Sequence, residues 1–558
     1  MPHLKVTPGT RPQSFFKDVR QRLLTPLIVT AGLMLLATCS NVVNLLLARG
    51  SNRRRELATR MALGAGRSRI VRQLLIETLL LGALGSGVGL LFAQWSLALL
   101  PMIFSQPYAG SGYAVWLNVE STRMGPLVLV FAVAIALLTS VAVGLVPALR
   151  STRMNLAAEF EGGMHSHGSR RLSRLSQTLV VVQVSIALSL LVGATLCVQT
   201  LKNLHAVDLG FRRERLLLFA TDAQGAGIGA EQFTSLAERI AGRIRALPGT
   251  RSVSYSGWPV LTGEGGPWVT PVSFPGKSDR PEQVIWNPVG PDFFETYQMP
   301  IVLGRGFDDR DSEEGLKVIV VNESFAKKYF GAESPIGRHL ELEGDREIVG
   351  VVRDAKLVVH DLRTPTSPMA FVPFAQSSRS LVRFVVRTEV EPETMIASAR
   401  KAVGEIAMGL PIVGMSSQEQ QVEWRFSNER LSGSVAAFIG VLATILASVG
   451  LYGLISYAVN RRTAEIGLRM ALGAGPRQVL WMVLSESLSI VLVGLLVGIG
   501  GACVLMRFAA ATFFGVGPMD PMTYLVVALL LSGVASAACW FPARRAAKVD
   551  PMVALRAE

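Results

Sequence analysis

The sequence predicts a polytopic α-helical membrane protein with about seven transmembrane helices and one α+β extracytoplasmic domain. Of its 558 residues, 50% are hydrophobic and only 17% are charged, whereas an ordinary soluble protein carries about 25% charged residues. The apolar residues are gathered in long runs, and these runs are separated by short basic segments and by one long polar region. This pattern excludes a protein that is water-soluble over its whole length.

Seven apolar runs are long enough to cross a bilayer. Five contain no charged residue, and they lie at 23–48, 124–149, 175–201, 431–460 and 521–543. Two more, at 70–99 and 478–506, contain a few charged residues, among them Glu77 and Glu486. At about 1.5 Å per residue, a helix of this size reaches roughly 35–40 Å, which exceeds a hydrocarbon core of about 30 Å. Each run therefore predicts one transmembrane helix.

The region 202–430 is rich in charged residues, proline and glycine, and this composition predicts a soluble domain. Stretches at 318–321 and 348–352 are typical of strands, while the patterns at 231–247 and 393–408 predict helices. The sequence thus predicts five parts, which are an extracytoplasmic tail (1–22), a three-span core with a cytoplasmic linker (23–174), a transmembrane helix (175–201), an α+β domain (202–430) and a second three-span core (431–558).

Basic residues are concentrated in four segments that border the apolar runs. Residues 49–72, 150–174, 461–477 and 544–558 contain 21 basic and 6 acidic residues, whereas the rest of the chain contains 34 basic and 35 acidic ones. Because Lys and Arg accumulate on the cytoplasmic side of membrane proteins, these segments and the C-terminus are predicted to be cytosolic. The large domain then lies outside the cytosol. The net charge of +14 comes from these four segments, where the membrane topology explains the excess of basic residues. We therefore expect no nucleic-acid binding.

An internal repeat is the most specific feature of the sequence. Residues 56–66 read ELATRMALGAG and residues 465–475 read EIGLRMALGAG, which are identical at eight of eleven positions with an offset of 409. Each copy follows one predicted span and leads into another, and Glu77 and Glu486 keep the same offset. Matched flanking spans indicate a duplicated unit of three helices.

Each copy of the repeat suits a short amphipathic elbow along the cytoplasmic face. We expect the arginine to reach water or lipid phosphate, the methionine and leucine to pack inward, and the glycines to allow a sharp turn into the next span. An ordinary basic loop with a helix stop is the alternative, and recurrence at the same place in the topology favours the elbow. The predicted elbow residues are Glu56, Arg60, Met61, Ala62, Leu63, Gly64, Ala65, Gly66, Glu465, Arg469, Met470, Ala471, Leu472, Gly473, Ala474 and Gly475.

The chain resembles the FtsX-like permeases of ABC transporters, in particular the MacB-like family. This resemblance rests on RRTAEIGLRMALGAGPRQVLWMVLSES and PARRAAKVDPMVALR, on their first-half partners RRRELATRMALGAGRSRIVRQLLIET and PALRSTRMNL, and on VGPDFFETYQMPIVLGRGF, VVNESFAKKYFGAESPIGRHL and IVGVVRDAK in the soluble domain. Two permease cores in one chain are similar to the duplicated orphan permeases. Against that pattern, the first half lacks a leading span and a soluble domain of its own.

The resemblance implies a permease subunit in the bacterial inner membrane. A separate cytoplasmic ABC-type ATPase dimer would hold ATP and magnesium, dock on the elbows and move the extracytoplasmic domain, which is of the MacB periplasmic-core type. Efflux and pure force transmission (mechanotransmission) are both open, as are envelope or efflux partner proteins and contacts with membrane lipid. The rival hypothesis is a non-transporting scaffold or regulator of envelope partners.

No catalytic, cofactor or metal site is predicted in the chain itself. A phosphate-binding loop would need glycine at position 271, where Pro271 stands before Gly276-Lys277-Ser278. His165 and His167 have no further ligands nearby, so a linker is favoured over a metal site. Glu77 and Glu486 are intramembrane acidic candidates, for which a structural role is favoured over a proton relay.

Polar and small residues within the spans predict helix packing. Asn41 and Asn44 are expected to hydrogen-bond to neighbouring helices, because an unpaired amide in hydrocarbon is costly. Small-residue spacing that permits close helix approach occurs at Gly82, Gly85, Gly89, Gly494 and Gly498.

Reporter fusions test the predicted topology. Alkaline phosphatase is active only outside the cytosol and green fluorescent protein folds well only inside it. We therefore expect phosphatase activity from a fusion after Arg430 and fluorescence from a fusion after Glu558. Fluorescence from a fusion within 202–430 would contradict the topology.

Overall fold

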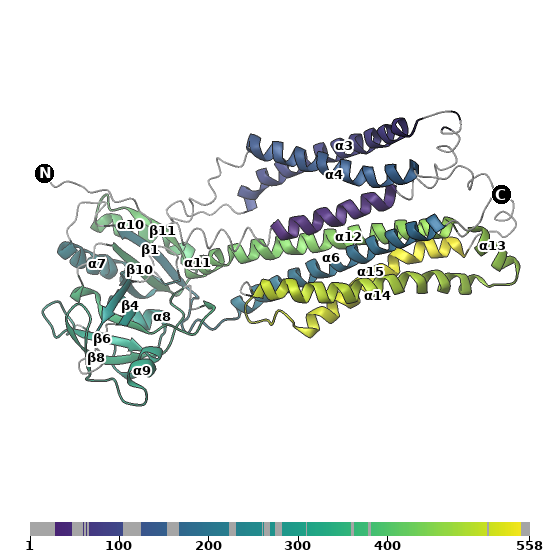
Figure 1. Ribbon diagram of the computed structural model, residues 1–558. Helices are drawn as coiled ribbons and strands as arrows, with labels where there is room; N and C mark the ends of the chain where they lie inside the picture. Colours follow the sequence, from purple (N-terminus) through teal and green to yellow (C-terminus); the bar gives the residue numbers. More distant parts are fainter. Residues whose placement is uncertain are drawn as a thin grey trace. The chain divides into compact units, whose positions relative to one another are not determined.

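The computed structural model describes residues 28–46, 60, 63, 66–103, 124–152, 167–222, 230–258, 260–261, 268–273, 282–308, 310–358, 362–377, 381–461, 463–510 and 513–547. The chain divides into two compact units (Figure 1). One contains the long apolar helices, and the other consists mainly of residues 204–428. The predicted tail 1–22 lies outside the described residues, as do residues 104–123.

Seven helices among the described residues are long and apolar enough to cross a membrane, which confirms the predicted number. The first is Ile28–Leu46. It is followed by α3 (Arg67–Ile103), α4 (Pro126–Thr152), α6 (His167–His205), α12 (Ser427–Arg461), α14 (Pro476–Phe508) and α15 (Pro521–Ala546). A short helix, α13 (Thr463–Ala471), joins α12 to α14.

The start of α15 shows how local sequence sets a helix boundary. The Asp520 carboxylate accepts hydrogen bonds from the Thr523 N–H at 3.1 Å and from the Thr523 hydroxyl at 2.6 Å. Pro521 occupies the first turn, where its missing N–H has no consequence. The acidic cap also lies at the positive end of the helix dipole and lowers the number of unsatisfied N–H groups.

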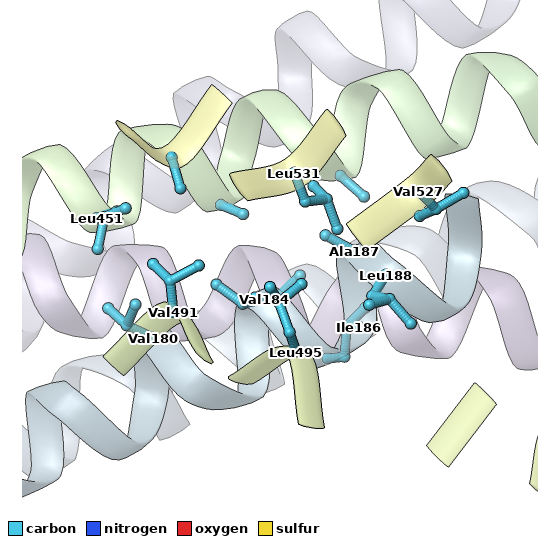
Figure 2. Packing of buried hydrophobic residues seen from close by; sticks show 14 of the residues in the cluster. Val180, Val184, Ile186, Ala187, Leu188, Leu451, Val491, Leu495, Val527 and Leu531 are labelled. Atoms are coloured by element: carbon cyan, nitrogen blue, oxygen red, sulfur yellow. The ribbon is translucent and has the colours of Figure 1, made fainter. Parts of the chain in front are cut away.

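Helix α6 is the most buried of the candidate spans. Within its most apolar window 56% of the residues are buried, compared with 6–33% for the other six helices. Its side chains Val184 and Leu188 pack among residues of α12, α14 and α15, as Figure 2 shows with Leu451, Val491 and Leu531. The α6 helix is therefore the centre of this hydrophobic core.

Glycines bring α14 close to α6. A Cβ atom at Gly494 would lie 2.8 Å from the Val184 Cβ, and one at Gly498 would lie 2.9 Å from the Ser185 Cα. In addition, the Ser185 hydroxyl donates a hydrogen bond to the Gly494 carbonyl at 2.8 Å. The expected close approach is thus confirmed at these two glycines.

In the first half, one of the three predicted glycine contacts is present. At Gly82 a Cβ atom would collide with the Ser140 hydroxyl, so α3 and α4 approach closely there. The prediction is not met at Gly85 and Gly89, because among the described residues no atom lies within 4 Å of a Cβ placed at either glycine.

The 204–428 unit is built on an eleven-stranded sheet. The strands are β1 (Leu216–Asp222), β2 (Thr250–Ser256), β3 (Trp268–Val272), β4 (Glu282–Val289), β5 (Ile301–Gly304), β6 (Val318–Asn322), β7 (His339–Glu341), β8 (Asp345–Val352), β9 (Met369–Pro373), β10 (Leu381–Thr388) and β11 (Ile412–Ser417). Their order is β11-β1-β10-β2-β4-β9-β6-β8-β5, with β3 on β4 and β7 on β8. The pairs β4–β9 and β6–β8 are parallel, and the others are antiparallel.

Two hydrophobic cores lie along this sheet. The helices of the unit are α7 (Ala230–Arg245), α8 (Phe293–Tyr297), α9 (Glu323–Phe330), α10 (Ile396–Ile406) and α11 (Gln418–Arg425), with 3-10 turns at Phe374–Gln376 and Pro392–Met395. In one core α7 and α10 pack on β1, β2 and β10. In the other α9 packs on β4, β6, β8 and β9. The sheet joins the two halves through a short β2–β4 ladder at Ser256 and Val289. The predicted α+β character is confirmed.

A matched pair of glycine substitutions tests the α6–α14 contact. Gly498→Val should overpack the helix interface and reduce the free energy of unfolding by about 1–3 kcal/mol. Gly500→Val is the control, because no atom lies within 4 Å of a Cβ at this position on the same helix. Thermal unfolding of the purified protein in detergent measures both, and equal destabilisation would contradict the packing.

Candidate functional site

The second elbow is a helix, a tight turn and a helix. Helix α13 ends at Ala471, and the N–H groups of Gly473 and Ala474 donate to the carbonyls of Met470 at 3.1 Å and Arg469 at 2.9 Å. Gly473 has a φ of +101°, which side chains other than hydrogen rarely allow. These bonds form a Schellman motif, so the sequence LGAG ends α13 by satisfying its last carbonyls.

Both elbows lead into the next span with the same backbone geometry. The Gly475 carbonyl accepts from the N–H of Gln478 at 3.0 Å, and the Gly66 carbonyl accepts from the N–H of Arg69 at 3.0 Å. The Gln478 side chain also accepts from the Gly475 N–H at 3.1 Å. Helices α3 and α14 therefore begin at Arg67 and Pro476, again 409 residues apart.

The contacts of the two elbow arginines also follow the internal repeat. Arg60 donates to the Gln73 Oε1 at 3.4 Å, and Arg469 contacts the Met482 Sδ at 2.8 Å. Both arginines are exposed. Each arginine therefore contacts the residue thirteen positions later in the sequence. That residue lies on the second turn of the following span.

The structure corrects the predicted direction of the elbow leucines. Leu63 is 84% exposed and Leu472 is 80% exposed, so neither packs inward. Leu472 lies two residues after Met470, and residues two positions apart do not share a helix face. Met470 does pack on the hydrophobic core, as predicted. Ala471 and Gly473 are exposed, Ala474 and Gly475 are half-buried, and Glu465 lies in α13. Glu56, Met61, Ala62, Gly64 and Ala65 lie outside the described residues.

Of the other candidate residues, the structure describes the two intramembrane acidic side chains. Glu77 is half-buried on α3 and Glu486 is exposed on α14. Gly276, Lys277, Ser278 and His165 lie outside the described residues, and nothing is described of the His167 side chain at the start of α6.

The first span meets the second half of the chain at repeat-equivalent positions. Asn41 corresponds to Gly450 by the offset of 409, and a Cβ atom at Gly450 would lie 2.5 Å from the Asn41 Oδ1. The Asn41 amide donates to the Leu446 carbonyl at 2.7 Å, and its oxygen accepts from Gln183 at 3.1 Å. Contact between equivalent residues is the property of a two-fold interface. The first span and α12 therefore meet at equivalent positions of the repeat.

Asn41 confirms the predicted interhelical hydrogen bond, but Asn44 does not. Neither its amide nitrogen nor its oxygen has a partner among the described residues, although both atoms are buried. Asn44 lies three residues after Asn41 on the same side of the helix, near the end that precedes the first elbow.

Two family models match the chain. The model described as FtsX-like permease C-terminal matches residues 28–156 and 437–551, and the model described as MacB-like periplasmic core domain matches residues 178–406. The two FtsX-like matches begin 409 residues apart, at the offset of the elbow repeat. The duplication therefore extends beyond the elbows to the flanking spans, and the soluble domain is of the MacB-like type.

Curated relatives match about half of the chain. A macrolide export ATP-binding/permease protein MacB from Chromobacterium violaceum is 30% identical over 284 residues, which cover 48% of this chain and 43% of that relative. An uncharacterized ABC transporter permease YknZ from Bacillus subtilis is 29% identical over 289 residues, 49% of this chain and 70% of that relative. The chain spans less than half the length of the ATP-binding/permease relatives that it matches.

Solved structures match the soluble unit. The periplasmic region of MacB from Actinobacillus actinomycetemcomitans matches with 14% identity and a TM-score of 0.29, and the match covers 41% of this chain and 98% of that one. The extracellular domain of the transporter YknZ from Gram-positive bacteria matches with 17% identity and a TM-score of 0.24, covering 34% of this chain and 91% of that one.

The Schellman turn predicts unequal effects of alanine at two elbow glycines. Gly473→Ala places a side chain at positive φ and should destabilise the turn by about 1–2 kcal/mol, so that elbow amides exchange about 5- to 30-fold faster. Gly475→Ala is the control, because its φ is −72° and no atom lies within 4 Å of a Cβ there. Hydrogen exchange followed by mass spectrometry measures both. Equal exchange in the two variants would show that the turn does not depend on Gly473.

Proposed function

Because the chain belongs to the FtsX-like ABC transporter permeases with a MacB-like periplasmic core domain, we propose that it couples ATP hydrolysis by a separate cytoplasmic ATPase to movement of its extracytoplasmic domain. It would act in the bacterial inner membrane, with the 204–428 unit outside and the C-terminus in the cytosol. The basic elbows and C-terminal segment support this orientation.

The observation that carries this proposal is the pair of exposed leucines, one at each elbow. Leu63 and Leu472 occupy the same repeat position, and more than three quarters of each side chain is exposed. Leu472 lies in a turn whose backbone is held by hydrogen bonds to the carbonyls of Met470 and Arg469. A rigid apolar tip with a basic neighbour is suited to insertion in a groove of a partner protein. Two such tips would engage the two subunits of an ATPase dimer.

The connectivity of the chain allows a movement of the second elbow to be transmitted to the soluble domain. The 204–428 unit is inserted between α6 and α12, so each of its ends continues into a span. These two helices pack on each other, since a Cβ at Gly440 would lie 2.9 Å from the Leu191 side chain. Helix α12 leads into the second elbow through α13. Displacement of that elbow would shift α12 against α6 and thereby strain the domain between them.

The names of the relatives favour export over force transmission alone. Relatives of this chain are described as a macrolide export protein and as a pyoverdine export protein, and both descriptions include an ATP-binding part. We infer by analogy that this chain takes part in efflux, with ATP and magnesium held by the separate ATPase. Envelope or efflux proteins would be its further partners on the outer side.

Charged substitutions at the elbow tips test the docking. Leu472→Asp should weaken association with the ATPase about tenfold or more, because an aspartate in an apolar groove loses both packing and hydration. Leu63→Asp should act on the other ATPase subunit with a similar loss. Co-purification of the ATPase with membrane-inserted permease measures both effects.

The control for docking is Leu316→Asp, since Leu316 is also 80% exposed but lies in the soluble unit. This variant should retain full ATPase association. If the two elbow variants also retain full association and ATPase activity, the elbows are interfacial turns and the coupling proposal is wrong.

The purified chain should neither bind nor hydrolyse ATP without its partner. A fluorescent ATP analogue should therefore give no saturable signal with the chain alone. Saturable binding that is lost in Lys277→Ala would instead assign a nucleotide site to the Gly276-Lys277-Ser278 segment.

A further inference from the structure

A cavity of about 310 Å³ lies in the soluble unit, beside strands β2 and β10 and the end of α8. Its lining includes two cationic residues, Arg251 and Arg387, and the apolar residues Phe294 and Met299. Glu295, which is exposed, is the acidic residue of the lining. Pockets for small ligands begin at about 300 Å³ and combine apolar walls with a few polar groups. The cavity has this composition and an excess of positive charge.

Arg387 is a buried cation with backbone partners. It is 6% exposed, and its Nε donates to the Thr296 carbonyl at 2.6 Å. Its two terminal nitrogens donate to the carbonyls of Glu214 at 3.1 Å and Arg212 at 2.8 Å. A guanidinium has five N–H donors, so these three bonds leave donor capacity free. Among the described residues, no carboxylate forms an ion pair with Arg387 or Arg251.

A β-bulge brings the second arginine to the same place. Arg387 pairs with Ser252, but the next residue, Thr388, pairs with Thr250, so Arg251 is the extra residue of β2. In a regular strand Arg251 and Ser252 would point to opposite faces of the sheet. A bulge changes the direction of a side chain locally, and here both residues line the cavity. Burial lowers the pKa of Arg387, and the neighbouring positive charge of Arg251 lowers it further.

The apolar wall is held rigidly. Phe294 is 6% exposed and packs edge-to-face on Phe371 with ring centroids 5.2 Å apart, and Met299 is 3% exposed. The Met299 N–H donates to the Phe294 carbonyl at 2.7 Å, which closes the turn after α8. The cavity therefore combines fixed apolar residues with two cationic residues.

We propose that this cavity binds a small organic anion, with its carboxylate or phosphate on Arg251 and Arg387 and its apolar body on Phe294 and Met299. Guanidinium groups pair with both kinds of acid through parallel N–H···O bonds. A cavity of about 150 Å³ is enough to hold benzene, so this one has room for a ring and an acidic group. The site is separate from the elbows and does not depend on their role.

Isothermal titration of the full chain in phosphatidylcholine nanodiscs tests the site with benzoate as the probe. Benzoate should bind saturably, and the neutral benzamide should bind at least tenfold more weakly. Arg251→Ala should weaken benzoate binding at least tenfold, because one of the two cations is lost. Arg338→Ala is the control, since this exposed arginine pairs with Glu333 in the other half of the domain and its loss should change nothing.

A second variant separates loss of the site from loss of the fold. Met299→Trp keeps both arginines but fills the cavity, so it should abolish benzoate binding while the unfolding temperature of the nanodisc-embedded chain stays measurable. Phenyl phosphate should bind more tightly than glycerol phosphate, which carries the charge of a lipid headgroup without the ring. Tighter binding of glycerol phosphate would overturn the assignment of an apolar-bodied anion. Failure of benzoate to saturate the chain, or binding that survives both Arg251→Ala and Met299→Trp, would overturn the site.

Discussion

Backbone contact between α6 and its neighbours is the interaction on which the membrane unit depends. Within a bilayer, helices gain little from expelling water, so they associate through close packing and interhelical hydrogen bonds. Gly494 and Gly498 allow α14 to approach α6, and the Ser185 hydroxyl bridges the two helices. Larger residues at these glycines would separate the helices and expose the buried face of α6. The remaining spans of the second half pack around the same helix.

The duplicated sequence produces a structure with internal two-fold character. The start of α3 repeats the backbone hydrogen bonds at the start of α14, and the first span meets α12 where Asn41 faces its own counterpart, Gly450. An asparagine opposite a glycine is an asymmetric solution, because two asparagines would collide at this separation. Gene duplication within one chain allows such a difference, whereas identical subunits must carry the same residue on both sides. Fusion thus lets the two halves diverge while their contact is retained.

Much of the fold could be predicted because apolar runs and charge bias act locally. The seven spans follow from long apolar runs, and α7 follows from a helical pattern, with α7 found at Ala230–Arg245 where 231–247 was expected. The α10 helix begins later than expected, because a 3-10 turn at Pro392–Met395 precedes it. The strand order and the bulge at Arg251 depend on pairing between distant segments, which periodicity does not encode. The predicted direction of Leu472 was wrong because Met470 and Leu472 lie two positions apart, whereas residues on one helix face lie three or four positions apart.

The central claim is that one chain carries both halves of a permease and offers two elbows to one ATPase dimer. Two exposed leucines at equivalent positions and a two-fold contact between the halves support this stoichiometry. Native mass spectrometry of the complex that co-purifies with the chain measures it directly. The account predicts one copy of this chain with two ATPase subunits. A complex with two copies of this chain for two ATPase subunits would show that each chain supplies only one working elbow, and it would contradict the account.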